Sequence, residues 1–187
     1  MINYWWVSRP KRKLNSVPEV LGTFAELSLN QQWEGERQTH LVFEDALEKA
    51  GLKRVGERRD QGGGGARTYK AWLVSLGLIF IQESTKQIKL TLAGEAILNG
   101  EPPVDILKNQ VIKYQFPSAF SVGKNVEVSP RFKVHPFVFL LKLLSDDRIN
   151  YLDIDEIANI IIVEADNDSE KCYERIVQRL LDYREFG

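Results

Sequence analysis

The sequence predicts a mainly α-helical protein that carries one small antiparallel β-hairpin. Apolar residues recur at helical spacing in several segments, as at Phe43, Ala46, Leu47 and Ala50. One stretch, residues 78–90, instead holds two short apolar runs separated by a polar turn, which is typical of a hairpin. With 43% apolar and 27% charged residues over 187 positions, the chain has the composition of one globular domain or two small ones.

Composition also excludes several classes of protein. No stretch reaches the roughly 18 uncharged apolar residues of a membrane span, and the N-terminal segment lacks the apolar core of a signal peptide. The single cysteine, Cys172, excludes an intrachain disulfide, and two histidines, His40 and His135, leave too few soft ligands for zinc. We therefore expect a cytoplasmic protein without a metal site of its own.

The net charge of −1 hides an asymmetry along the chain. Residues 1–144 carry 20 Lys/Arg and 14 Asp/Glu, whereas residues 145–187 carry 5 and 12. Such a distribution indicates a basic face for a polyanion and an acidic region that faces elsewhere.

Helices are expected first over Val20–Leu29 and His40–Ala50, the second of which ends at Gly51. A basic segment without apolar periodicity follows and contains four consecutive glycines, residues 62–65. These glycines match neither a P-loop nor a dinucleotide fingerprint. A flexible loop that orders on a polyanionic partner is favoured over a plain linker.

The next 33 residues, 66–98, carry the most specific pattern in the chain. A helix over Ala66–Leu76, with an apolar stripe and a capping Gly77, is followed by strands at 78–81 and 88–90. Thr91 then caps a short helix over Leu92–Leu98. This order is that of the recognition helix and wing of a winged-helix fold, a variant of the helix-turn-helix.

The remainder of the chain is predicted to be mostly helical. Helices are expected over 104–115 (with Val104, Leu107, Val111 and Tyr114 inward), 137–144, 154–163 and 170–184. Residue composition indicates that 137–144 is buried nearly all round, that Asp153 and Glu156 form a capping box, and that Ser169 caps the last helix. The expected domains are a winged-helix subdomain at 1–117 (core 40–100), a connector at 118–134 and a second helix-turn-helix-like subdomain at 135–187, whose wing would lie beyond Gly187.

Candidate DNA contacts follow from the recognition-helix assignment. Arg67 and Lys70 lie near the N-terminus of that helix with Thr68, at the end that meets base edges in the major groove. Further basic side chains would contact phosphates from the N-terminal arm, the loop and the wing: Arg9, Lys11, Arg12, Lys13, Arg58, Arg59, Lys86 and Lys89. The alternative for each is an ordinary solvated surface residue.

Residues for nuclease chemistry are not found in the sequence. A restriction-type site needs an acidic residue followed by Glu-x-Lys, and the nearest variant, Gln87-Ile88-Lys89, is interpreted as part of the wing. The acidic run Glu164, Asp166 and Asp168 lacks the remaining ligands of a calcium loop and is interpreted as capping the last helix. No catalytic residue is therefore assigned.

Several segments resemble the AlwI-like family of type IIS restriction and nicking endonucleases. They include residues 4–10 (YWWVSRP), 76–80 (LGLIF), 90–95 (LTLAGE), 103–108 (PVDILK), 113–118 (KYQFPS) and 135–144 (HPFVFLLKLL). The resemblance implies a recognition region of winged-helix subdomains that binds double-stranded DNA, followed by a Mg²⁺-dependent cleavage domain. This sequence lacks the residues of that second domain, so the chain itself is expected to be non-catalytic and to hold no cofactor.

Two other functions remain open at this point. The chain could be a stand-alone winged-helix regulator. It could also be a protein-interaction module in which residues 145–187 dock a cleavage domain or a second subunit.

Overall fold

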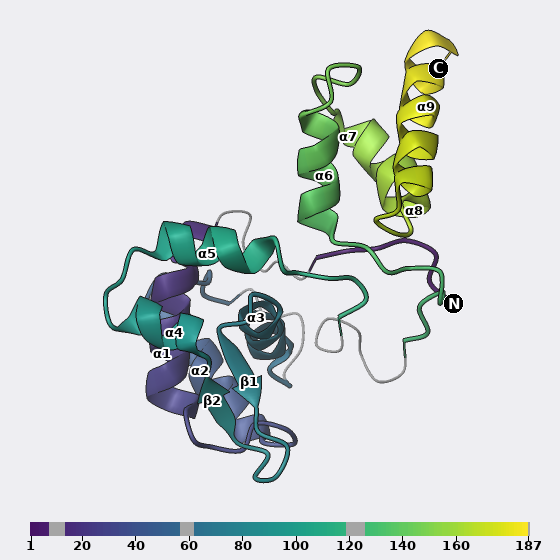
Figure 1. Cartoon of the computed structure of the whole chain (residues 1–187). Coiled ribbons are helices and arrows are strands. Elements are labelled where there is room, and N and C mark those ends of the chain that lie inside the picture. Colours follow the sequence, from purple (N-terminus) through teal and green to yellow (C-terminus); the bar gives the residue numbers. More distant parts are fainter. Residues whose placement is uncertain (8–13, 57–61, 119–125, 187) are drawn as a thin grey trace. The chain divides into compact units, whose positions relative to one another are not determined.

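The computed structural model describes residues 1–7, 14–56, 62–118 and 126–186 (Figure 1). The protein is mainly helical, with 55% of its residues in helices, and it has one two-stranded antiparallel sheet. The chain divides into two compact units, here named the sheet unit (residues 8–110) and the helical unit (residues 1–7 and 111–187). Each unit has its own buried apolar core.

This division differs from the expected domain ranges at both ends of the first subdomain. Residues 1–7 belong to the helical unit, where the Trp5 backbone N–H donates to the Ile162 carbonyl at 3.1 Å. Tyr114 and Phe116 belong there too, and both are buried. The reason is apolar burial, because the rings of Trp5, Tyr114 and Phe116 complete the core of this unit.

The sheet unit contains both strands and the helical elements that precede them or follow them up to residue 111. They are η1 (Leu14–Ser16), α1 (Val17–Ser28), α2 (Arg37–Lys49), α3 (Gly64–Ser75), β1 (Ile79–Ile81), β2 (Ile88–Leu90), α4 (Leu92–Leu98) and α5 (Pro103–Val111). The first three α-helices begin two or three residues earlier than the sequence predicts. The strand β2 and the helix α4 have the predicted bounds, and the Thr91 hydroxyl accepts from the Gly94 backbone N–H at 3.1 Å, which confirms the predicted cap.

The core of the sheet unit is built from aromatic rings of α1, α2 and the segment between them. The Phe24 ring lies 5.0 Å from the rings of both Trp33 and Phe43. All three side chains are at least 98% buried. Edge-to-face and tilted packing of this kind adds to the stabilisation from apolar burial.

The turn after α1, residues 29–32, pairs with β2 in a way that the sequence pattern did not reveal. In the paired strands, Phe80 lies opposite Lys89. Residues 29–32 run beside β2, and the Asn30 N–H donates to the Ile88 carbonyl at 2.9 Å. The Ile88 N–H in turn donates to the Gln31 carbonyl at 3.0 Å. β2 is therefore hydrogen-bonded on both edges.

The helix α5 is shorter than predicted and one of its inward assignments is wrong. It ends at Val111 rather than Gln115. Leu107 is buried as expected, but Val104 is 62% exposed. The face of α5 that packs carries Ile106 and Gln110, both half-buried, together with Leu107, and Val104 lies beyond the edge of this face in solvent.

The helical unit contains α6 (Pro136–Leu144), α7 (Ile154–Glu156), the π-helical turn η2 (Ile157–Ile161), α8 (Ile162–Glu164) and α9 (Glu170–Phe186). The predicted capping box is confirmed, because Asp153 accepts from the Glu156 N–H at 2.7 Å and Glu156 accepts from the Asp153 N–H at 3.0 Å. The Ser169 hydroxyl accepts from the Cys172 N–H at 3.2 Å, so it caps α9 as predicted.

The prediction that α6 is buried nearly all round is wrong. Phe139 and Leu143 are buried, but Val138, Leu141 and Leu144 are 42%, 55% and 48% exposed. The helix packs through one face, and among the described residues of the helical unit nothing covers the other. An apolar composition on every side does not guarantee a partner on every side.

Candidate nucleic-acid interface

The helix α3 presents one buried face and one exposed face. Its predicted apolar stripe is confirmed, since Tyr69, Trp72 and Leu73 are all buried. Arg67 and Thr68 are exposed, in the N-terminal half of the helix. The stripe therefore fixes the rotation of α3 so that Arg67 and Thr68 point outward.

Arg67 and Thr68 both bond to the glycine segment that begins α3. The Arg67 guanidinium donates to the Gly62 carbonyl at 2.6 Å, and the Thr68 hydroxyl donates to the Gly64 carbonyl at 3.0 Å. Gly63, with φ of 76°, is the N-cap residue, and Gly64 and Gly65 form the first helical turn. The predicted flexible loop is thus already helical at residues 64 and 65.

The other predicted contact residue of α3, Lys70, is less accessible. Its side chain is 14% exposed and its ammonium group lies 3.2 Å from a carboxylate oxygen of Glu34. Glu34 comes from the segment that precedes α2 and was not singled out in the sequence. No local signal links residues so far apart, so only the fold could identify this pair.

The loop between β1 and β2 positions Lys86 at the hairpin tip. The Gln82 N–H donates to the Gln87 carbonyl at 2.9 Å, and the Lys86 N–H donates to the Gln82 carbonyl at 2.8 Å. Lys86 has a left-handed backbone, with φ of 58°, and its side chain is exposed. It is therefore well placed to meet a phosphate.

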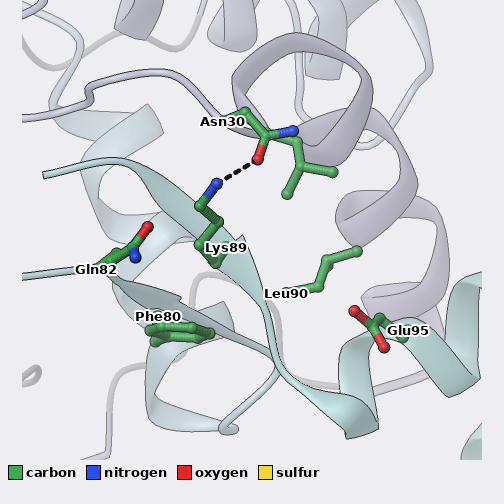
Figure 2. Close-up of a pocket in the computed structure, with 7 residues that line it drawn as sticks. Asn30, Phe80, Gln82, Lys89, Leu90 and Glu95 are labelled. Carbon is green, nitrogen blue, oxygen red and sulfur yellow. Dashed lines mark hydrogen bonds between the residues drawn. The ribbon is translucent and has the colours of Figure 1, made fainter. Parts of the chain in front are cut away.

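Lys89 does not lie at the hairpin tip but in the middle of β2. Its ammonium group donates to the Asn30 side-chain oxygen at 2.7 Å (Figure 2). Phe80, its cross-strand partner, lies beside it and is 40% exposed. The sequence did not predict a role for Asn30. Asparagine often takes a left-handed backbone directly after a helix, and Asn30 could have been predicted to do so from its position.

A buried charge cluster joins α2 to the start of α3. The Lys53 ammonium lies 3.1 Å from Glu44 and 3.0 Å from Glu48, and the Glu44 side chain is only 1% exposed. Burial lowers the pKa of Lys53, but its hydrogen bonds to Glu48 and Glu44 outweigh this effect, and the pKa is raised overall. A Cβ atom on Gly65 would meet a Glu44 carboxylate oxygen, so glycine at this position permits the close approach of the two helices.

The remaining predicted contact residues lie outside the described residues. They are Arg9, Lys11, Arg12 and Lys13 of the N-terminal arm and Arg58 and Arg59 of the segment before α3.

The helical unit pairs many of its basic side chains with carboxylates. Arg148 bonds both Asp146 and Glu174, while Arg175 lies 3.3 Å from Asp166 and Arg179 lies 3.6 Å from Glu164. Hydrogen bonds from Arg148, and then from Tyr173, hold the pKa of Asp146 well below its ordinary value. These pairs reduce the attraction of this unit for phosphate.

The acidic run at residues 164–168 has a different role from the one predicted. Asp168 accepts from the His135 backbone N–H at 3.0 Å, so it caps the start of α6 rather than that of α9. The His135 ring nitrogen Nδ1 also lies 2.6 Å from this carboxylate. In the part of the chain that the structure describes, no group of three or more His, Cys, Asp or Glu side chains is arranged to hold a metal ion.

Among the described residues, no helix is both long and apolar enough to cross a membrane. Comparison of the chain with protein-family models finds no match, and comparison with curated proteins finds none either.

Proposed function

We propose that the sheet unit is a winged-helix module that binds double-stranded DNA, with α3 as the recognition helix and the β1–β2 hairpin as the wing. One observation carries the proposal. The chain order is α1, the turn at residues 29–32, α2, α3, β1 and β2, and β2 is bonded to both β1 and that turn. A winged helix combines a helix pair, a hairpin directly after the second helix, and a short segment after the first helix that pairs with the hairpin.

The orientation of α3 supports the same proposal. Its apolar stripe is buried, and Arg67 and Thr68 face outward near its N-terminus. An arginine in this position can donate to both O6 and N7 of guanine, and a threonine can contact a base edge or a phosphate. In this arrangement Lys86 at the hairpin tip meets the DNA backbone.

The connector between α2 and α3 departs from the simplest helix-turn-helix. It covers residues 50–63, whereas the usual turn has about three or four residues. This longer connector carries Lys53, Arg54, Arg58 and Arg59 close to the start of α3 in sequence. In the proposed complex Arg58 and Arg59 supply phosphate contacts, whereas Lys53 is already paired with Glu44 and Glu48.

The resemblance to AlwI-like endonucleases extends the proposal to the whole protein. We propose that the chain is the DNA-recognition region of a type IIS-like restriction or nicking endonuclease. Cleavage then belongs to a Mg²⁺-dependent domain outside this chain, which docks through residues 145–187. A stand-alone winged-helix regulator is the alternative, and the reading frame after Gly187 distinguishes the two: a downstream acidic residue with Glu-x-Lys supports the endonuclease.

The test is selection of bound duplexes from a randomised DNA library at low salt. We expect one enriched asymmetric motif. Arg67→Ala should then weaken binding to that motif by about 1–3 kcal/mol and relax the preference at one base pair. Arg179→Ala, an exposed arginine of the helical unit, is the matched control and should change neither.

The absence of any enriched motif would contradict sequence-specific recognition. Equal loss of affinity for all sequences in Arg67→Ala would instead make Arg67 a phosphate contact.

A further inference from the structure

A pocket of about 560 Å³ opens on the outer face of the sheet in the sheet unit (Figure 2). It is lined by Leu29, Asn30, Phe80, Gln82, Lys89, Leu90 and Glu95. None of these side chains belongs to α3. Phe80, Lys89 and Leu90 come from the strands of the hairpin and not from its tip at Lys86, so the pocket is separate from α3 and from that tip.

The aromatic ring of Phe80 is an unusual feature of this sheet face. Its neighbour on β1, Ile79, is buried at 2% exposure, whereas Phe80 points to the opposite face and is 40% exposed. Solvent-facing positions of a half-buried strand normally carry polar residues. Phe80 instead presents a flat apolar surface to the pocket.

Hydrogen-bonding groups surround that ring in a fixed arrangement. Lys89, opposite Phe80, donates to the Asn30 side chain at 2.7 Å. A lysine can only donate, so the amide oxygen of Asn30 must face it, and the amide nitrogen is directed away from Lys89 (Figure 2). The Gln82 side-chain oxygen accepts from the Thr85 hydroxyl at 3.0 Å, and this bond orients the Gln82 amide.

The charges of the pocket are divided between two sides. Lys89 supplies an ammonium group beside Asn30, and Glu95, from α4, supplies a carboxylate at another side of the pocket (Figure 2). An anion is attracted to the lysine side and repelled from the glutamate side. The carboxylate can instead accept from an amino group.

A nucleotide combines the groups that this arrangement would bind. Its base has a flat face for stacking on Phe80 and an edge that exchanges hydrogen bonds with amides or a carboxylate, and its phosphate suits the Lys89 ammonium. The volume lies within the range of about 300–1,000 Å³ that is usual for small-ligand sites. A base within a duplex is stacked on both faces, so only an unpaired base can lie on the Phe80 ring.

We propose that this pocket binds one unpaired nucleotide of single-stranded DNA, with the base on Phe80 and the phosphate at Lys89. This site goes beyond duplex recognition by α3 and does not depend on it. Both could act on one DNA molecule wherever a strand is locally unpaired.

The experiment uses the full chain and single-stranded DNA octamers of deoxycytidine, deoxyadenosine or thymidine. In Phe80→Trp, octamer binding should quench the fluorescence of the introduced, exposed indole, and the wild-type chain should show much less quenching. Phe80→Ala should lose about tenfold in affinity, because stacking on an aromatic side chain supplies much of such binding. Leu92→Ala, which removes an 86% exposed side chain outside the pocket, should bind as the wild type does.

Two further variants test the polar groups of the pocket without removing the ring. Asn30 has φ of 63°, so Asn30→Gly suits the same backbone and removes only the amide; it should weaken binding several-fold. Lys89→Gln should make affinity less dependent on salt, by the change in slope that corresponds to the loss of about one phosphate contact. Thermal unfolding checks that each variant remains folded.

Two results would overturn the proposal. One is equal octamer affinity for the wild type and a folded Phe80→Ala variant. The other is equal affinity for DNA and for an abasic deoxyribose-phosphate octamer, which would show that charge alone binds the strand. Arg67→Ala should leave octamer binding unchanged and Phe80→Ala should leave duplex binding unchanged, so failure of one proposal is distinguishable from failure of the other.

Discussion

The ammonium group of Lys70 on α3 lies 3.2 Å from a carboxylate oxygen of Glu34, in the segment before α2. The lysine side chain is 14% exposed, whereas the glutamate side chain is 62% exposed. The pair thus holds a basic side chain of the proposed recognition helix against the protein. A DNA phosphate or base must compete with Glu34 for Lys70.

Removing this competitor should strengthen DNA binding. Glu34→Gln keeps the shape of the side chain but not its charge, so we expect duplex affinity to rise about two- to fivefold, in line with the roughly 0.2–1 kcal/mol of an exposed ion pair. Fluorescence anisotropy at low salt measures the change. Glu101→Gln, an exposed glutamate elsewhere in the sheet unit, controls for net charge and should give a smaller rise. Weaker binding by Glu34→Gln would instead make Glu34 a direct acceptor for DNA.

Two helical glycines should respond to alanine in opposite directions. A Cβ atom on Gly22 in α1 would lie 4.0 Å from Leu98, in ordinary contact. Gly22→Ala should therefore stabilise the protein by about 0.5–1 kcal/mol through helix propensity. A Cβ atom on Gly65 in α3 would collide with the Glu44 carboxylate, which is buried and held by Lys53, so Gly65→Ala should destabilise it. Urea unfolding of both variants checks this contrast, and stabilisation by Gly65→Ala would contradict the close packing of α2 and α3.

The ion pair between Glu156 and Arg184 should contribute to the stability of the helical unit in a pH-dependent way. The Glu156 side chain is 1% exposed, and Arg184 lies 2.5 Å from it and also donates to the carbonyls of Ile149 and Tyr151. The hydrogen bond from Arg184 lowers the pKa of Glu156 from 4.5. A lowered pKa contributes stability above the unfolded value, and this contribution is lost as pH falls through the folded value.

Arg184→Met should accordingly cost about 3 kcal/mol at neutral pH, because it leaves a buried carboxylate unpaired. The difference from the wild type should shrink as pH falls, because Glu156 of the variant, buried without its cation, protonates at a higher pH than Glu156 of the wild type, whose pKa is lowered from 4.5 by Arg184. Chemical unfolding between pH 3 and pH 7 measures both. Arg179→Met, at an exposed position on the same helix, serves as the control and should cost less than about 0.5 kcal/mol. A constant difference at all pH values would exclude Glu156 as the cause.

Two leucines of α6 should differ strongly in their contribution to stability. Leu143 is fully buried, so Leu143→Ala should cost about 2–5 kcal/mol. Leu141 is 55% exposed, so Leu141→Ala should cost less than about 1 kcal/mol. Urea unfolding distinguishes the two. Similar costs for both would mean that the exposed face of α6 is covered in solution.

The elements that the sequence predicts well are those with local signals. Thr91, the Asp153–Glu156 capping box and Ser169 each begin a helix at the predicted residue, because a cap acts over only three or four positions. The buried stripe of α3 is equally local, since its 3.6-residue period marks one face whatever lies opposite it. From this stripe the outward direction of Arg67 and Thr68 could be predicted as well.

What the sequence could not predict depends on partners that are distant along the chain. The turn at residues 29–32 pairs with the sheet only because β2 lies beside it. Lys70 is held by Glu34, and Lys89 by Asn30, 59 residues away. Apolar composition likewise indicated burial of α6 on all sides, but burial requires a facing element, and only one side has one among the described residues of its unit.

For this protein, then, the sequence by itself determined the class, mainly helical with one small hairpin, and the face of α3 that turns outward. Both follow from interactions within a few residues, whose geometry repeats with the helix or strand period. The tertiary structure decided the division into a sheet unit and a helical unit, the pairing of residues 29–32 with β2, and the pocket that Phe80 lines. These depend on contacts between distant segments, which packing of the whole chain selects and no local pattern encodes.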